Sequence, residues 1–239
     1  MRILDIFKRS RPLRFAVLTL LLVGAVIYQF RNPWFRGNFG VVDEGLVYRS
    51  AQPADGLANL IKEKRIATVL NLRGGSTSDP WYTAEVDLTR RLGVDFYDLP
   101  LVATVRPSRK QLLTVLDLLD RCRYPLLIHC KSGSDRTGLV SGLYLMSRKQ
   151  VDPELAESAF SVYYGHYPVL GTRHLHEPFQ EYADWLRSVR QPHTSERLRE
   201  WVAHVYKADD SYAEIIPLQA GPRPRRTAIR ISNELDQVR

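Results

Sequence analysis

The stretch PLLIHCKSGSDRTG, residues 125–138, most constrains the fold, because it joins an apolar strand to a helix through a loop of small and polar residues. PLLIH (125–129) has the length and the side chains of a buried strand, and the next helix is predicted from about Thr137 to Lys149. A strand that leads directly into a helix is typical of parallel βαβ units. The loop is therefore expected at the carboxyl edge of a sheet, where open α/β sheets bind their ligands.

The rest of the chain predicts the same alternation of strands and helices. Further strands are expected at 46–49, 68–72 and 94–99. Helices are expected from caps at Asp55, Asp79 and Ser108, and over 152–165, 177–190 and 195–207. The sequence thus predicts an α/β fold with a mainly parallel sheet of four to five strands, flanked by helices on both faces.

The N-terminal segment contains an uncharged apolar run, FAVLTLLLVGAVIYQF, at 15–30. Its 16 residues fall short of the roughly 20 that an untilted spanning helix needs, so a cleaved signal peptide competes with a membrane anchor. No small-x-small cleavage site follows, and aromatic residues typical of a membrane interface do, which favours an uncleaved single-pass anchor. These aromatic residues are Tyr28, Phe30, Trp34 and Phe35.

The distribution of charge bears on topology and partners. Basic residues precede the apolar run, so the positive-inside rule predicts a cytoplasmic N-terminus and an exported, periplasmic domain after the anchor. The net charge of +8 favours anionic partners, although much of the excess lies in this flank and in the basic tail GPRPRRTAIR (221–230). Three parts are expected: residues 1–36 with the anchor and a linker, a domain at 37–190, and a C-terminal helix and tail at 191–239.

The loop after the strand can hold an oxyanion. Small residues at Ser132, Gly133 and Ser134 let the backbone curl with its N–H groups inward, beside the N-terminus of a helix. Arg136 adds a planar fork that can grip two oxygens of the same anion. Because these groups favour a thiolate, the pKa of Cys130 is expected well below the usual value of about 8.5.

A thiolate at the floor of a phosphate-sized cradle predicts attack on phosphorus and a covalent thiophosphate intermediate. Thr137 is placed to hydrogen-bond the departing thiolate, and Gly138 and Gly142 are expected to let the helix pack closely on the sheet. Cys122, the only other cysteine, is expected to have no function. Two cysteines exclude a disulfide framework, and neither a metal nor another cofactor is expected.

The pattern His129-Cys130-x5-Arg136-Thr137-Gly138 resembles the signature of the cysteine-dependent protein tyrosine and dual-specificity phosphatases. The resemblance spans about residues 37–190. VYRSAQP (47–53) and VLNLR (69–73) are similar to early segments of the compact atypical members from bacteria, fungi and plants. It implies that Cys130 is the nucleophile, that Arg136 clamps the phosphate, and that His129 supports the loop from behind.

Two aspartates compete for the role of general acid. Members of the family normally carry it on a separate loop before the cysteine, but the corresponding stretch DLPLVATVRPS (98–108) contains only Asp98, at the end of its strand. Asp135, next to Arg136, matches an aspartate that some lipid and bacterial members carry in the loop. Asp135 is favoured on geometric grounds, and Asp98 stays open as the alternative.

The expected activity is a metal-independent phosphomonoesterase that acts through a cysteinyl-phosphate. Phosphotyrosine in proteins is the default substrate by resemblance. Lys131 resembles a loop lysine of phosphoinositide-directed members; together with the anchor and the basic surface, it makes a phospholipid or inositol phosphate the alternative substrate. Arg73 is a candidate second anion contact. A non-catalytic phosphate-binding membrane module is a third reading, and no nucleic acid partner is expected. A loop with Arg173, His174 and His176 could also approach the cleft.

Overall fold

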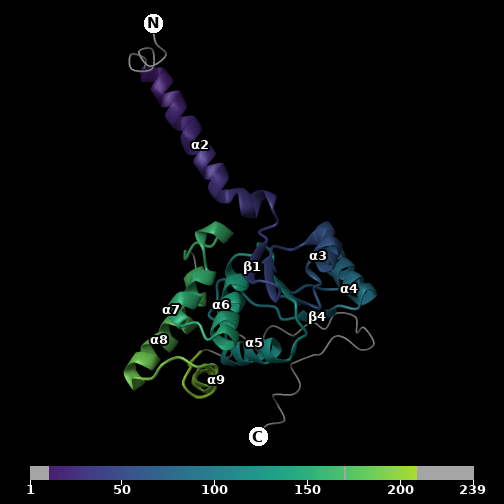
Figure 1. Cartoon of the computed structure of the whole chain (residues 1–239), viewed down its shortest axis with the longest axis vertical. Helices are drawn as coiled ribbons and strands as arrows, with labels where there is room; N and C mark the ends of the chain where they lie inside the picture. Colours follow the sequence, from purple (N-terminus) through teal and green to yellow (C-terminus); the bar gives the residue numbers. More distant parts are fainter. Residues whose placement is uncertain (1–10, 170, 209–239) are drawn as a thin grey trace.

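A five-stranded sheet lies at the centre of the fold in the computed structural model, which describes residues 11–169 and 171–208 (Figure 1). The strand order is β1-β2-β5-β3-β4; β1 is antiparallel to β2, and the other neighbours are parallel. The strands are β1 (Gly40–Asp43), β2 (Val47–Ser50), β3 (Thr68–Asn71), β4 (Asp95–Asp98) and β5 (Leu126–His129). The predicted α/β fold is confirmed, and β1 is an additional strand near the start of the domain predicted at 37–190.

Helices cover both faces of the sheet. The helices are α3 (Leu57–Lys64), α4 (Pro80–Leu92), α5 (Arg109–Arg121), α6 (Asp135–Lys149), α7 (Pro153–Ala156), α8 (Glu177–Val189) and α9 (Ser195–His204), and a further helix, α2 (Arg11–Phe35), precedes the sheet. Short 3-10 turns are η1 (Ala54–Gly56), η2 (Glu157–Ala159), η3 (Val162–Tyr164) and η4 (Thr172–Leu175). Side chains alternate between the faces of each strand, so Val69 and Leu127 pack with α3 and α4, whereas Leu70 and Ile128 pack with α5, α6, α8 and α9.

The helix caps test the local predictions. Ser108 caps α5 as predicted: its Oγ accepts from Gln111 N at 3.1 Å, and Gln111 Oε1 accepts from Ser108 N at 2.9 Å. Asp79 does precede α4, but its carboxylate accepts from Ser76 N at 2.9 Å rather than from the helix. The predicted cap at Asp55 is wrong, because Asp55 lies inside η1, which feeds directly into α3.

The segments after the loop differ from prediction in two ways. Helix α6 begins at Asp135, two residues before the predicted start, which places Asp135 and Arg136 in its first turn. The single helix predicted over 152–165 is broken into α7, η2 and η3, because the chain becomes extended at Phe160.

The two glycines of α6 serve a different contact from the predicted one. A Cβ on Gly138 would lie 2.8 Å from the ring of Phe160, and one on Gly142 would lie 2.7 Å from the ring of Phe179. The glycines therefore bring α6 close to the aromatic residues of the α7–α8 region rather than to the sheet.

Helix α2 extends away from the rest of the molecule (Figure 1). The stretch from Phe15 to Phe35 has 21 residues, a mean hydropathy of 1.5, and almost no buried residues in its most apolar part. It is therefore long and apolar enough to cross a membrane. The base of α2 is tied to the domain, since Asn32 Nδ2 donates to Asn38 Oδ1 at 3.1 Å and both residues are buried. Length and composition alone fit either an anchor or a signal sequence.

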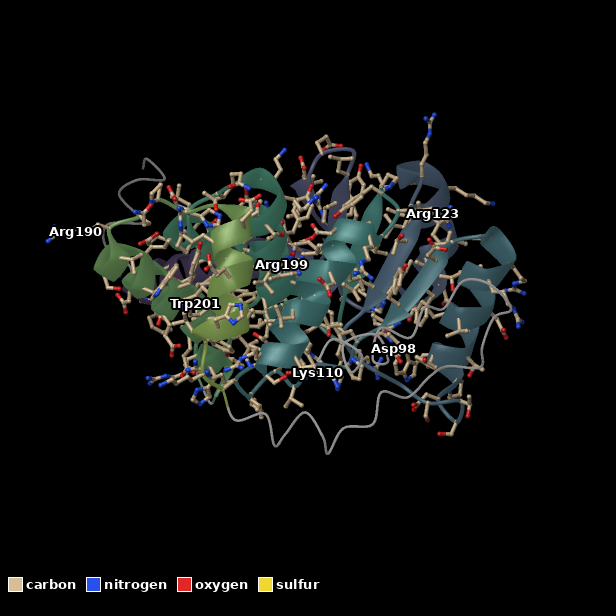
Figure 2. All side chains as sticks on the ribbon, turned by 90° about the horizontal axis from the view of Figure 1, so that it is seen from below. Asp98, Lys110, Arg123, Arg190, Arg199 and Trp201 are labelled. Carbon is tan, nitrogen blue, oxygen red and sulfur yellow. The ribbon has the colours of Figure 1, made fainter. Side chains whose placement is uncertain are left out.

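Helix α9 packs against α5 and α6 on the lower face of the molecule, where Trp201 is labelled in Figure 2. Leu198, Trp201 and Val202 are buried in the same core cluster as the strand residues Leu70 and Ile128. The predicted basic tail at 221–230 and the basic residues before position 11 lie outside the described residues.

Candidate active site

The loop from Cys130 to Ser134 connects the end of β5 to the start of α6 at the carboxyl edge of the sheet. Cys130 is 1% exposed, and its Sγ accepts a hydrogen bond from Gly133 N at 3.2 Å. Gly133 has a φ of +70°, and a Cβ there would lie 2.5 Å from backbone atoms of Ser50 and Ala51. Only glycine therefore allows this loop to curl against the end of β2 with its amide on the sulfur.

The surroundings of the thiol favour its ionised form. Burial by itself raises the pKa of Cys130, but the charge of Arg136, the hydroxyl and amide of Thr137 and the amide of Gly133 together lower it below its usual range. The lowered pKa expected from the sequence is confirmed in direction. A larger fraction of this buried sulfur is consequently thiolate, the nucleophilic form.

The guanidinium of Arg136 is held by hydrogen bonds at Nη1, whereas its Nε has no partner among the described residues. Its Nη1 donates to the carbonyl oxygens of Leu72 at 3.3 Å and Leu101 at 3.2 Å, at the ends of β3 and of the segment after β4. Its Nε is buried and has no hydrogen-bond partner within the described part of the chain. An unpaired buried guanidinium N–H beside a thiol of lowered pKa is suited to an anion.

His129 lies fully buried behind the loop, next to Glu85 of α4. The distance from His129 Nε2 to Glu85 Oε1 is 2.7 Å, and both side chains are buried. Burial by itself lowers the pKa of His129, but the Glu85 carboxylate outweighs it and the pKa is raised. Gln52 Nε2 holds the other oxygen of Glu85 at 2.7 Å. Glu85 was not predicted from the sequence.

Arg49 of β2 is a second residue that the sequence did not single out. It is 2% exposed, and its guanidinium donates to the carbonyl oxygens of Ala159 at 2.7 Å, Gly133 at 2.9 Å and Ser134 at 3.3 Å. It also lies 3.8 Å from the centre of the Tyr164 ring. Burial lowers the pKa of Arg49 to about 10, so the residue stays charged at neutral pH. Arg49 therefore holds the loop backbone in place through the carbonyl oxygens of Gly133 and Ser134.

The two candidate acids have different surroundings. Tyr82 donates its hydroxyl to Asp98 Oδ2 at 2.8 Å, and Asp98 Oδ1 is buried without a partner among the described residues. Burial raises the pKa of Asp98 to about 7; the Tyr82 hydrogen bond opposes this, and the charge of Glu85 adds to it. One oxygen of Asp98 is therefore occupied by Tyr82, and the other is shielded from solvent.

Asp135 instead contacts His166, which in turn contacts a second histidine, His176. Its Oδ1 lies 2.7 Å from His166 Nδ1, and His166 Nε2 lies 2.7 Å from His176 Nε2. His176, from the loop expected to approach the cleft, thus reaches Asp135 only through His166, which the sequence did not single out. Arg173 and His174 do not share this network, and His174 Nδ1 contacts Glu177 at 2.6 Å.

The predicted substrate contacts differ in how exposed they are. Lys131 and Ser132 are exposed, whereas Gly133 and Ser134 are buried. The Arg73 guanidinium stacks over the Trp81 ring at 3.7 Å and donates to Gln52 Oε1 at 3.5 Å. Gln52 N in turn donates to the Lys131 carbonyl at 3.3 Å, which brings Arg73 next to the loop.

Cys122 is not part of the loop. Cys122 is buried at the end of α5, and burial raises its pKa to about 11, which leaves an unreactive thiol. Within residues 11–169 and 171–208, no three His, Cys, Asp or Glu side chains are grouped so that they could hold a metal ion.

The fold and the loop are those of the cysteine-dependent phosphatase superfamily that includes the tyrosine and dual-specificity phosphatases. Residues 36–164, just over half of the chain, match the family model described as PTP-NADK, a DSP-PTPase phosphatase fused to NAD+ kinase. The chain belongs to this family.

Individual relatives agree with this assignment. An inositol diphosphatase DSP1 from rice (Oryza sativa subsp. japonica) is 32% identical over 113 residues, which cover 44% of this chain and 47% of the rice protein. The chain thus spans about half the length of this curated relative.

A solved structure shares the fold, and a second one is a weaker match. The crystal structure of Pseudomonas aeruginosa TpbA with phosphotyrosine matches with a TM-score of 0.51 and 21% identity, covering 70% of this chain and 96% of that chain. The core domain of the Saccharomyces cerevisiae PP-IP phosphatase SIW14 matches with a TM-score of 0.43 and 18% identity, covering 77% and 96%.

Proposed function

We propose that this chain is a metal-independent phosphomonoesterase that works through a cysteinyl-phosphate on Cys130. The observation that carries the proposal is the pairing of a buried thiol of lowered pKa with the unpaired Nε of Arg136. A thiolate supplies the nucleophile, and the guanidinium supplies the positive charge that a phosphoryl group needs.

The reaction has two steps. The Cys130 thiolate attacks phosphorus, the P–O bond to the leaving group breaks, and the leaving oxygen takes a proton from Asp135. Water then attacks phosphorus, Asp135 takes a proton from it, and the S–P bond breaks to return the thiolate. Arg136 and the loop amides stabilise the equatorial oxygens in both steps, and Thr137 hydrogen-bonds the departing sulfur.

Asp135 is the preferred acid because of where its carboxyl lies. It belongs to the first turn of α6, directly beside Arg136, and its side chain is 22% exposed. Asp98 is held by buried Tyr82 and has a buried, unpaired second oxygen. A general acid must be within hydrogen-bond reach of the leaving oxygen, so geometry favours Asp135 even though the pKa of Asp98 is raised to about 7.

The test is hydrolysis of aryl phosphates by the full chain in detergent micelles. Cys130→Ser is expected to lose activity by several orders of magnitude. Cys122→Ser is the matched control and is expected to keep it, because that thiol is buried at the end of α5 away from the loop. Undiminished activity in Cys130→Ser would refute the mechanism.

A phosphorylated inositol or phospholipid headgroup is a second candidate substrate, alongside phosphotyrosine. Lys131 is exposed directly after the nucleophile, and Arg73 lies beside the loop, so two cations are available for additional phosphates. The rice relative is named for an inositol diphosphatase activity. A panel of phosphopeptides, inositol phosphates and phosphoinositide vesicles distinguishes the candidates.

Lys131→Ala tests this choice. It is expected to raise KM about tenfold for polyphosphorylated inositols, and to leave KM for a phosphotyrosine peptide within about twofold. Lys62→Ala, an exposed lysine of α3, is the control for lost surface charge. Equal effects of Lys131→Ala on both substrate classes would argue against selection by this residue.

We further propose that residues 1–36 form an uncleaved anchor, that 37–190 form the phosphatase domain, and that 191–239 add a C-terminal helix and tail. The apolar stretch from Phe15 to Phe35 supports anchoring. Membrane fractionation and protease protection of the full chain test the anchor and the exported orientation. If phosphate analogues bind but no ester is hydrolysed, the chain acts as a non-catalytic phosphate-binding module instead.

A further inference from the structure

We propose that Asp135, His166, His176 and Glu157 form a proton relay that stores the proton used by the general acid. The relay rests on the proposed role of Asp135 and deepens it by naming the groups that supply its proton. Three contacts join its members in series, and each ring uses both of its nitrogens. They are Asp135 Oδ1 to His166 Nδ1 at 2.7 Å, His166 Nε2 to His176 Nε2 at 2.7 Å, and His176 Nδ1 to Glu157 Oε1 at 2.6 Å.

The number of contacts fixes the number of protons. A ring nitrogen without its proton and an ionised carboxylate are both acceptors, so each of these short contacts requires one bridging proton. Two ionised carboxylates and two neutral imidazoles supply only two protons, one on each ring. Three contacts therefore require one proton more than these groups carry in their ordinary states at neutral pH.

The charge of Glu157 keeps the extra proton within the relay. If Glu157 is ionised, it accepts Nδ1–H of His176, and the other two contacts then need two protons, of which two neutral rings can supply only one. The third proton lies on one of the rings, as an imidazolium, or on the Asp135 carboxyl, and it can pass between them along the same contacts. The relay thus holds one proton that Asp135 can deliver.

The surroundings protect this arrangement. His166 is 3% exposed, and the ring of Phe160 packs on both imidazoles, at 4.9 Å from His166 and 4.1 Å from His176 between ring centres. Little water can therefore replace the internal contacts. The outer carboxylate of Glu157 is 26% exposed, and Gln180 Nε2 also donates to its Oε1 at 2.8 Å.

The relay explains how Asp135 serves as acid and then as base. When Asp135 gives its proton to the leaving oxygen, the relay holds two protons for three contacts, and one contact loses its hydrogen bond. That deficit is relieved when Asp135 takes the proton released by the water that attacks the cysteinyl-phosphate. Each turnover then returns the relay to three protons, and no net charge is left behind.

The sharpest test is Glu157→Gln in the full chain, because it keeps the hydrogen bonds of the relay but reverses their direction. The introduced amide donates one N–H to His176 Nδ1, and the exposed Gln180 can turn its own amide to accept the other. His176 then donates to His166, and His166 donates to Asp135, which satisfies every contact with an ionised Asp135. This substitution at the exposed end of the relay should therefore remove the catalytic proton without disturbing the fold.

The readout is kcat/KM for two aryl phosphates with leaving groups of different basicity. General acid catalysis contributes about 10²- to 10⁴-fold, so Asp135→Asn is expected to lose about a hundredfold on phenyl phosphate. Glu157→Gln is expected to lose at least about tenfold on the same ester. Both variants should stay within about threefold of wild type on 2,4-dinitrophenyl phosphate, whose leaving group needs no proton.

Glu154→Gln is the matched control, because its carboxylate lies three residues earlier and pairs only with the exposed Arg187 among the described residues. It should match wild type on both esters. His166→Ala is a second variant, and added imidazole should restore part of its lost activity on phenyl phosphate by filling the vacated space. A Glu157→Gln variant equal to wild type on phenyl phosphate, or one that loses equally on both esters, would overturn the relay.

The outcomes separate this inference from the proposed function. If Asp135→Asn shows the leaving-group dependence and Glu157→Gln does not, the relay is wrong and the general acid stands. If neither shows it while Cys130→Ser is inactive, the acid assignment and the relay both fail and the cysteine mechanism stands. Only an active Cys130→Ser variant would overturn the mechanism itself.

Discussion

Replacing Asp98 by asparagine should stabilise the protein at alkaline pH, because the wild-type carboxyl is held where its ionised form is unfavourable. Burial raises its pKa from 3.8 to about 7, and the charge of Glu85 adds to the effect. Figure 2 labels Asp98, at the end of β4. A carboxyl whose pKa is higher in the folded state binds more protons there, so stability falls as pH rises between the two values.

The magnitude follows from the two pKa values. Each pKa unit corresponds to 1.36 kcal/mol, so ionising Asp98 costs the folded state on the order of 4 kcal/mol above pH 8 and almost nothing below pH 4. Asparagine has nearly the same shape, and its Oδ1 can still accept from the Tyr82 hydroxyl. Asp98→Asn should therefore raise the free energy of unfolding by on the order of 4 kcal/mol at pH 8, and by much less at pH 5.

The assay is urea denaturation of the full chain in detergent at pH 5, 6, 7 and 8, followed by tryptophan fluorescence. Asp95→Asn is the control: it lies on the same strand, and its carboxylate pairs with Arg123 at 2.6 Å, so its loss should not stabilise the protein at pH 8. A destabilisation by Asp98→Asn that is the same at every pH would refute the reasoning. So would a stabilisation that grows toward low pH.

Other substitutions test the loop and the scaffold. Arg49→Lys should lower the free energy of unfolding by about 3 kcal/mol and should also reduce kcat, because a lysine cannot donate to all three buried carbonyl oxygens. Values of kcat and stability equal to those of the wild type would contradict this. Gly133→Ala should abolish activity, whereas Gly93→Ala, with a similar φ of +68° and no atom within 4 Å of the added Cβ, should cost only about 1 kcal/mol and keep kcat. Ser108→Ala should lower the free energy of unfolding by about 1 kcal/mol without changing kcat, as measured by denaturation and aryl phosphate hydrolysis.

The sequence was sufficient for the fold because local and global signals agree. The four predicted strands end within one or two residues of β2, β3, β4 and β5, and the cap at Ser108 forms as expected. β1 was missed because its four residues pair only with β2 at the edge of the sheet and lack a strong apolar pattern. The helix predicted over 152–165 failed because Phe160 leaves the helix to pack against the histidines.

The site was predictable only where its residues are consecutive. The loop from Cys130 to Arg136 carries its chemistry in one stretch of sequence. Arg49, Glu85 and His166 reach it from other elements, and each contact spans at least 31 positions in the chain. No periodicity or spacing encodes such contacts, because they depend on how β2, α4 and the segment after η3 pack around the loop.

The account depends most directly on the covalent intermediate at Cys130. Mixing the full chain with an aryl phosphate, quenching in acid within milliseconds and mapping the bound phosphate by mass spectrometry tests it in one measurement. We expect phosphate on the peptide that contains Cys130, formed with a burst of the released phenol and absent in Cys130→Ser. Phosphate on another residue, or turnover with no bound phosphate and no burst at any quench time, would contradict the account.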